Sequence, residues 1–117
     1  MGQETLREDI LKTEYSYDFD EKRKNSMVTS YYKYGAMSEN YGGKEKNVDA
    51  IASLKKRLEL YEQTGNTDYL VDVANFEMIE YMYPREGSYY KAGTSDESPG
   101  VVGLSVGELK MMKEGFM

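Results

Sequence analysis

Residues 47–83 read "NVDAIASLKKRLELYEQTGNTDYLVDVANFEMIEYMY", and this stretch decides the fold. Its first half places apolar side chains at helical spacing and stops at "TGN", where Gly65 is typical of a helix C-terminal cap. A second helical run begins near Thr67 and is ended by Pro84. The pattern predicts an antiparallel helical hairpin, with arms about 25 Å long. The apolar stripe of the first arm is Ala50, Ile51, Leu54, Leu58 and Tyr61.

The segments before the hairpin complete a mainly α-helical fold, which we predict to be a single domain over 1–117. Residues 3–12 and 21–34 carry apolar side chains at helical spacing. Between them, the stretch 14–20 alternates aromatic rings with acids, which leaves open a small β element there. Residues 35–46, "GAMSENYGGKEK", are typical of a loop.

After the hairpin, residues 84–104 form a long connection with no clear period. Its Tyr89, Tyr90 and Lys91 would suit either a docking finger or a simple connector. A last short helix is predicted from Ser105, because Ser105 and Glu108 have the spacing of a capping box.

The composition restricts the chemistry available to the chain. It contains neither Cys nor His, so it lacks thiolate and imidazole ligands and the commonest general base near neutral pH. No apolar run is long enough to span a membrane, which predicts a cytoplasmic protein. Leu, Ile, Val and Phe make up only 21 of 117 residues, and twelve Tyr and eight Met add further apolar surface. We therefore expect a small core and a tyrosine-rich surface.

The negative charge is concentrated in the second half of the hairpin. Residues 58–83 contain six acids and no Lys or Arg, which matches the whole net charge of −6. This balance argues against direct binding to nucleic acid and favours a basic protein partner. The predicted core stripe of the second arm is Leu70, Val71, Ala74, Met78, Tyr81 and Met82.

The opposite side of this arm mixes carboxylates with aromatic rings, which suits a docking surface because a tyrosine buries its ring while its hydroxyl stays wet. The alternative is that the helix is central and that its second face packs under residues 1–34. The predicted partner-binding residues are Glu59, Glu62, Asp68, Tyr69, Asp72, Phe76, Glu77, Glu80 and Tyr83.

Two acidic pairs in the hairpin form an ExxE…ExxE pattern, which resembles that of the MazG-like nucleotide pyrophosphohydrolases. The resemblance covers residues 33–83 and implies an all-α, magnesium-dependent enzyme, with the carboxylates holding the metal ions. Helical geometry argues against it, because Glu62 and Glu77 would stand about 13 Å apart along the hairpin. Level neighbours would instead be Glu59 with Asp72, and Glu62 with Asp68. The metal ligands under this alternative are Glu59, Glu62, Glu77 and Glu80; otherwise no catalytic residue, metal or cofactor is predicted.

The stretch "ANFEMIEYMYP", followed by "TSDESPG", is similar to the sequences of small uncharacterised proteins of bacteriophages and other bacterial mobile elements. Short, acidic, Cys-free proteins of this class are often inhibitors of host defence, including anti-CRISPR proteins that occupy the nucleic-acid site of an effector nuclease. The resemblance implies such an inhibitor, acting in the bacterial cytoplasm on a basic defence protein. A third hypothesis is a self-associating structural or regulatory module, in which the Tyr- and Met-rich face closes a homodimer.

Overall fold

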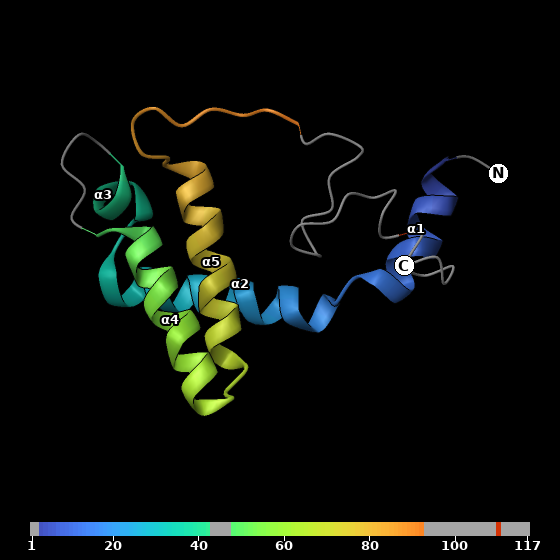
Figure 1. Ribbon diagram of the computed structural model, residues 1–117, viewed down its shortest axis with the longest axis horizontal. Helices are drawn as coiled ribbons and strands as arrows, with labels where there is room; N and C mark the ends of the chain where they lie inside the picture. Colours follow the sequence, from blue (N-terminus) through green and yellow to red (C-terminus); the bar gives the residue numbers. More distant parts are fainter. Residues whose placement is uncertain (1–2, 43–47, 93–109, 111–117) are drawn as a thin grey trace. The chain divides into compact units, whose positions relative to one another are not determined.

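The computed structural model describes residues 3–42, 48–92 and 110. The chain divides into two compact units, Met1–Glu86 and Gly87–Met117. The described residues are mainly helical, as predicted, and contain no strand (Figure 1). The helices of the first unit are α1 (Gln3–Glu14), α2 (Tyr17–Tyr34), α3 (Met37–Tyr41), α4 (Ala50–Thr64) and α5 (Asp68–Met82).

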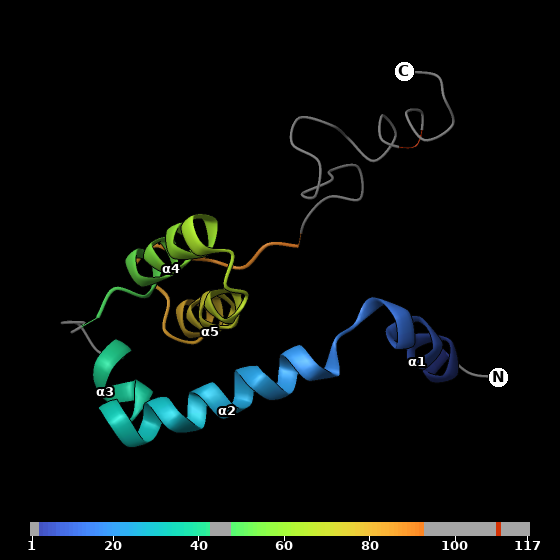
Figure 2. The same cartoon turned by 90° about the horizontal axis from the view of Figure 1, so that it is seen from below.

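The predicted hairpin is confirmed as α4 and α5, which lie side by side in both ribbon views (Figures 1 and 2). The Asp49 side chain accepts the backbone N–H of Ala52 at 3.1 Å and so begins α4. Gly65 ends it in the left-handed conformation at φ 75°, donating its N–H to Tyr61 O at 2.7 Å. Asn66 Oδ1 then accepts the N–H of Asp68 at 3.0 Å, which starts α5.

Helix α5 is the central element of the described fold, because it packs against both α4 and α2. Towards α2, Arg23 donates from Nη1 to Met78 Sδ at 3.0 Å, and Asn75 donates from Nδ2 to Arg23 O at 3.2 Å. Towards α4, Arg57 Nε lies 3.3 Å from Asp72 Oδ2. The acidic and aromatic side of α5 therefore turns partly towards α4, while part of the predicted core stripe turns towards α2.

The buried core of the described residues is small, as the composition predicts. Its members belong to α4 and α5, and one of them is polar. The predicted stripe on α5 is wrong at its end, since Tyr81 and Met82 are exposed. Much of the apolar surface of this unit is therefore exposed to solvent. The buried residues are Ala50, Val71, Asn75 and Ile79.

The small β element left open near 14–20 is not formed, because residues from Tyr17 onward belong to α2. Ser16 Oγ accepts the N–H of Phe19 at 3.0 Å and caps the helix. Asp18 and Asp20 lie in the first turn, where the helix dipole favours negative charge, and Asp18 pairs with Lys22 at 2.8 Å. These local interactions outweigh the two-residue alternation, which is too short to specify a strand.

The predicted loop over 35–46 contains the short helix α3. Asn40 donates from Nδ2 to Tyr34 O at 3.0 Å, which folds α3 back onto the end of α2. Residues 43–47 lie outside the described residues.

In the second unit, residues 87–92 and Lys110 are described. Residues 84–92 form neither helix nor strand, which agrees with the predicted connection over that part. The rest of the connection and the helix predicted from Ser105, apart from Lys110, lie outside the described residues. The single domain over 1–117 stays a prediction, since a domain of this size can contain two compact units.

We expect Gly65→Ala to lower the free energy of unfolding by about 1 kcal/mol, since a Cβ disfavours the left-handed conformation. The added Cβ would meet no atom within 4 Å, so the loss reports conformation alone. Gly65→Asn should lose less, because asparagine tolerates this conformation better. Urea unfolding of both variants measures the difference. Equal stability of the alanine variant and the parent protein would contradict the cap.

Candidate functional site

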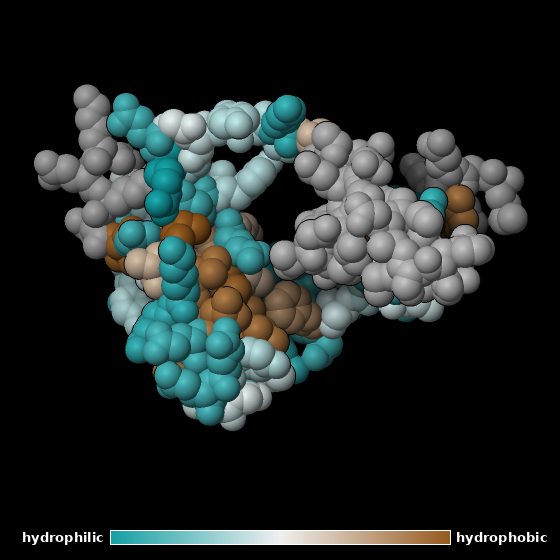
Figure 3. All heavy atoms as spheres, viewed as in Figure 1, coloured by the Kyte–Doolittle hydropathy of each residue, from teal (hydrophilic) through white to brown (hydrophobic). Residues whose placement is uncertain are grey.

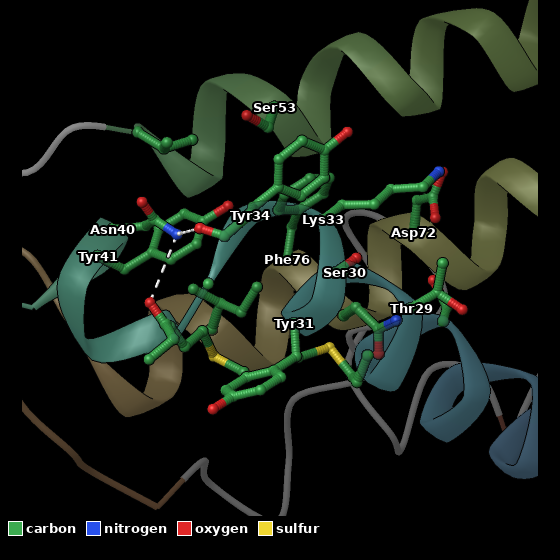
Figure 4. A pocket seen from close by; sticks show the side chains of 18 of the residues that line it. Thr29, Ser30, Tyr31, Lys33, Tyr34, Asn40, Tyr41, Ser53, Asp72 and Phe76 are labelled. Carbon is green, nitrogen blue, oxygen red and sulfur yellow. Dashed lines mark hydrogen bonds between the residues drawn. The ribbon is translucent and has the colours of Figure 1, made fainter.

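The first unit contains a cleft of about 980 Å³ between α2, α3, α4 and α5. Its volume lies in the range of ordinary ligand pockets. Figure 4 shows Ser53 of α4 and Tyr31 of α2 on opposite sides of the cleft, and the Asn40 amide bonded to the turn after α2. Aromatic rings and thioethers dominate the large side chains of the lining: Tyr31, Tyr34, Tyr41, Phe76, Tyr83, Met27, Met37 and Met82.

The aromatic side chains that α2 contributes to the cleft are exposed. Tyr31 is 60% exposed and Tyr34 is 71% exposed, although both line the same cleft as two buried residues of α5. Figure 3 shows apolar side chains gathered along α5, with hydrophilic side chains beside them over α4. Contiguous exposed apolar surface bordered by polar residues is typical of a binding site.

The charged groups of the cleft are Lys33, Arg57 and Asp72, so its lining carries one more positive than negative charge. Asp72 is half-buried, and this burial raises its pKa above the usual value although the neighbouring Arg57 opposes the shift. The nearby Asp68 raises the pKa of Asp72 further. Burial and the repulsion from Asp68 together therefore outweigh the effect of Arg57 on the pKa of Asp72.

Asn75 lies on the α5 side of the cleft and is only 5% exposed. Its Nδ2 donates to Arg23 O at 3.2 Å, and this bond fixes the orientation of the amide. Within the described residues, its Oδ1 is buried and accepts no hydrogen bond. An unpaired buried carbonyl lowers the stability of the fold and is rare in native structures, so Asn75 Oδ1 is an unusual feature of the cleft.

The structure divides the six predicted acids into two groups. Asp72 is held by Arg57, and Glu80 Oε2 accepts from Arg85 Nε at 3.2 Å. Glu59, Glu62, Asp68 and Glu77 are exposed. Among these four, Glu59 Oε2 lies 4.0 Å from Lys56 Nζ. The hydrogen bond from Lys22 to Asp18 raises the pKa of Lys22, and the negative charge of Asp68 adds a smaller effect in the same direction. Four of the six predicted acids are therefore exposed, so the acidic surface open to a partner is smaller than the sequence indicates.

The three predicted aromatic anchors are all half-buried on α5 or at its end. Phe76 and Tyr83 line the cleft together with Asp72, whereas Tyr69 is not part of the lining. The structure thus brings three predicted residues into one site.

Three residues of the lining are not among the predicted partner-binding residues: Tyr31, Tyr34 and Tyr41. A signal for two of them exists, since Met27, Tyr31 and Tyr34 fall on one side of a helix at 100° per residue. Tyr41 carries no such signal, because its position depends on α3, which the sequence did not predict.

The four glutamates of the hydrolase pattern do not converge. Within residues 3–42 and 48–92, no group of three or more acidic side chains is arranged to hold a metal ion. The expected neighbour of Glu59 on α5, Asp72, pairs with Arg57 instead. The metal-ligand set Glu59, Glu62, Glu77 and Glu80 therefore has no support from this geometry.

Comparison with protein-family models, curated proteins and solved structures finds no match to this chain. Among the described helices, none combines the length and apolar character that crossing a membrane requires. The geometry of the first unit is therefore the basis on which a function can be proposed.

We expect the pH dependence of stability to report the desolvation of Asp72. A carboxyl group whose folded pKa is raised contributes stability at low pH and loses it as the pH rises through that pKa. The stability of Asp72→Asn relative to the parent should therefore increase between about pH 3 and about pH 7. Urea unfolding at both pH values measures it, with Glu77→Gln as an exposed control on the same helix. A relative stability that decreases over this range would show that the Arg57 ion pair dominates.

Proposed function

We propose that this protein binds and inhibits a basic protein, and that the target is a bacterial defence nuclease such as a CRISPR effector. The observation that carries the binding function is the cleft with its exposed Tyr31 and Tyr34. Tyrosine is enriched at the centres of protein interfaces, where its ring is buried and its hydroxyl finds a partner. The nuclease target is suggested by the resemblance to mobile-element proteins, and it would place the protein in the bacterial cytoplasm, without direct contact to nucleic acid.

The exposed acids of the hairpin support a basic partner. Glu62 on α4 and Glu77 on α5 point into solvent, and no ion pair involving either is found among the described residues. Such charges accelerate association with an oppositely charged surface and are screened by salt. Their role is therefore to guide the partner, while the cleft supplies the contact area.

Self-association is a second candidate, because the same exposed tyrosines would serve an interface between two copies. The net charge of −6 opposes it, since two copies repel each other. Light scattering of the purified chain distinguishes the two candidates: a stable dimer favours self-association, and a monomer favours a separate partner.

The charge-guided function predicts that Glu62→Lys combined with Glu77→Lys weakens inhibition. The target is first identified by pull-down from a bacterial lysate at low and moderate salt, and is then purified. We expect the double variant to associate with it about tenfold more slowly, because steering is reversed. Inhibition of the purified nuclease should decline in parallel.

The matched control is Glu8→Lys combined with Glu21→Lys, which makes the same change in net charge on α1 and α2. Both glutamates are exposed, so the fold should tolerate their substitution by lysine. Circular dichroism establishes that both double variants are folded. If the folded hairpin variant binds and inhibits like the parent, or if the control is equally impaired, the hairpin acids are not the docking charges.

A further inference from the structure

We infer that the cleft between α2 and α5 receives a tryptophan side chain of the partner protein, whose indole N–H donates a hydrogen bond to Asn75 Oδ1. The identity of the partner rests on the proposed function, whereas the chemistry of the anchor rests on the cleft itself. The starting observation is the buried Oδ1, which accepts no hydrogen bond within the described residues. A ligand that donates to it would remove the cost of this unpaired atom.

The walls of the cleft require the donor to sit on an apolar, preferably aromatic body. Tyr31, Tyr34 and Phe76 provide ring surfaces, and Met27 and Met82 provide thioethers. Aromatic rings pack well against both, and methionine adapts its shape to an incoming ring. This adaptability matters because Oδ1 is shielded from solvent, so the side chains around it must shift before a ligand reaches it.

The charges of the cleft require the donor to be neutral. Lys33 and Arg57 outnumber Asp72, and Asp72 is already paired with Arg57. A lysine or arginine anchor would therefore meet a net positive lining. A carboxylate or phosphate is excluded for another reason, since its oxygens are acceptors and cannot donate to Asn75 Oδ1.

Among neutral aromatic donors, indole fits better than phenol. The indole N–H is a donor only, so one hydrogen bond satisfies it completely. A phenol hydroxyl would also bring acceptor lone pairs next to the buried Asn75 Oδ1, and these need a donor of their own at that point. The chain itself contains no Trp, so the anchor comes from a different protein and not from a second copy.

The absence of Trp from the chain also makes the experiment direct. N-acetyl-tryptophanamide is an uncharged probe, and its fluorescence can be excited selectively while the full-length chain is titrated in. We expect saturable binding with a blue-shifted emission, as the indole leaves water. The 1-methyl derivative of the probe lacks the N–H, and we expect it to bind about five- to tenfold more weakly, the effect of one lost hydrogen bond. N-acetyl-tyrosinamide, followed as a competitor, should also bind more weakly.

Variants connect the preference to the cleft. Asn75→Leu should remove the discrimination between the indole and 1-methylindole probes. Because this variant also loses the bond to Arg23 O, Tyr31→Ser provides a second measurement on an exposed wall residue. It should weaken both probes to a similar extent. Tyr81→Ser is the matched control, since Tyr81 is exposed on α5 and does not line the cleft.

Four results would overturn the inference: no saturable binding, equal affinity for the two indole probes, no effect of Tyr31→Ser, or tighter binding of free tryptophan than of the amide. The last would identify a free small molecule as the ligand instead of a partner side chain. The probes need neither the partner nor its charge, so the variant with Glu62→Lys and Glu77→Lys should bind them like the parent. Failure of this inference and failure of the proposed function are thereby separated.

Discussion

The packing of both α4 and α2 against α5 is the constraint on which the described structure depends. Two polar contacts fix it, one between Arg57 and Asp72 and one between Asn75 and the backbone of Arg23. Both involve groups that are costly to bury, so neither adds much stability by itself. Their value is geometric, because each is satisfied only when the helices meet in one arrangement. The cleft is the space that this arrangement leaves between α2, α3, α4 and α5.

The small core explains why the cleft is lined by exposed rings. With few Leu, Ile, Val and Phe, the chain cannot fill the space between three helices with aliphatic side chains. Tyrosine and methionine are the apolar residues that remain, and tyrosine keeps part of its surface wet. The composition that limits the core therefore also produces a surface suited to binding. A partner that fills the cleft would complete the packing that the chain lacks, and would stabilise the fold by mass action.

Much of the hairpin could be predicted because its signals are local. Gly65 caps α4 through its own backbone conformation, and Pro84 follows soon after α5 ends. The start of α2 is harder to predict, because the alternation around Tyr17 is typical of a strand whereas Ser16, which accepts the N–H of Phe19, begins the helix. Period-two patterns over a few residues do not exclude a helix when a cap and (i, i+4) ion pairs are also present.

The candidate site could be predicted only in part, because it depends on which side of α5 each neighbour covers. Helical spacing correctly grouped Asp72 and Phe76, but a helix with two neighbours has no single buried face for such a pattern to identify. Tyr41 and the cleft volume depend on α3, which has no periodic signal and is joined to the end of α2 by the hydrogen bond from Asn40 Nδ2 to Tyr34 O. The sequence also cannot show that Asp72 is paired with Arg57, because tertiary packing brings these two side chains together.

In the proposed binding mode, the exposed acids of the hairpin and the cleft have separate physical roles. Exposed charges such as Glu62 act over about 8 Å in physiological salt, so they affect how often a partner arrives in the correct orientation. A donor paired with Asn75 acts only after water has been excluded, so it affects how long the partner stays. The buried amide also selects against apolar side chains that lack a donor, because these would leave Oδ1 unpaired. In the proposed binding mode, the stability that the unpaired Asn75 Oδ1 costs the free protein is regained when the partner's donor reaches it.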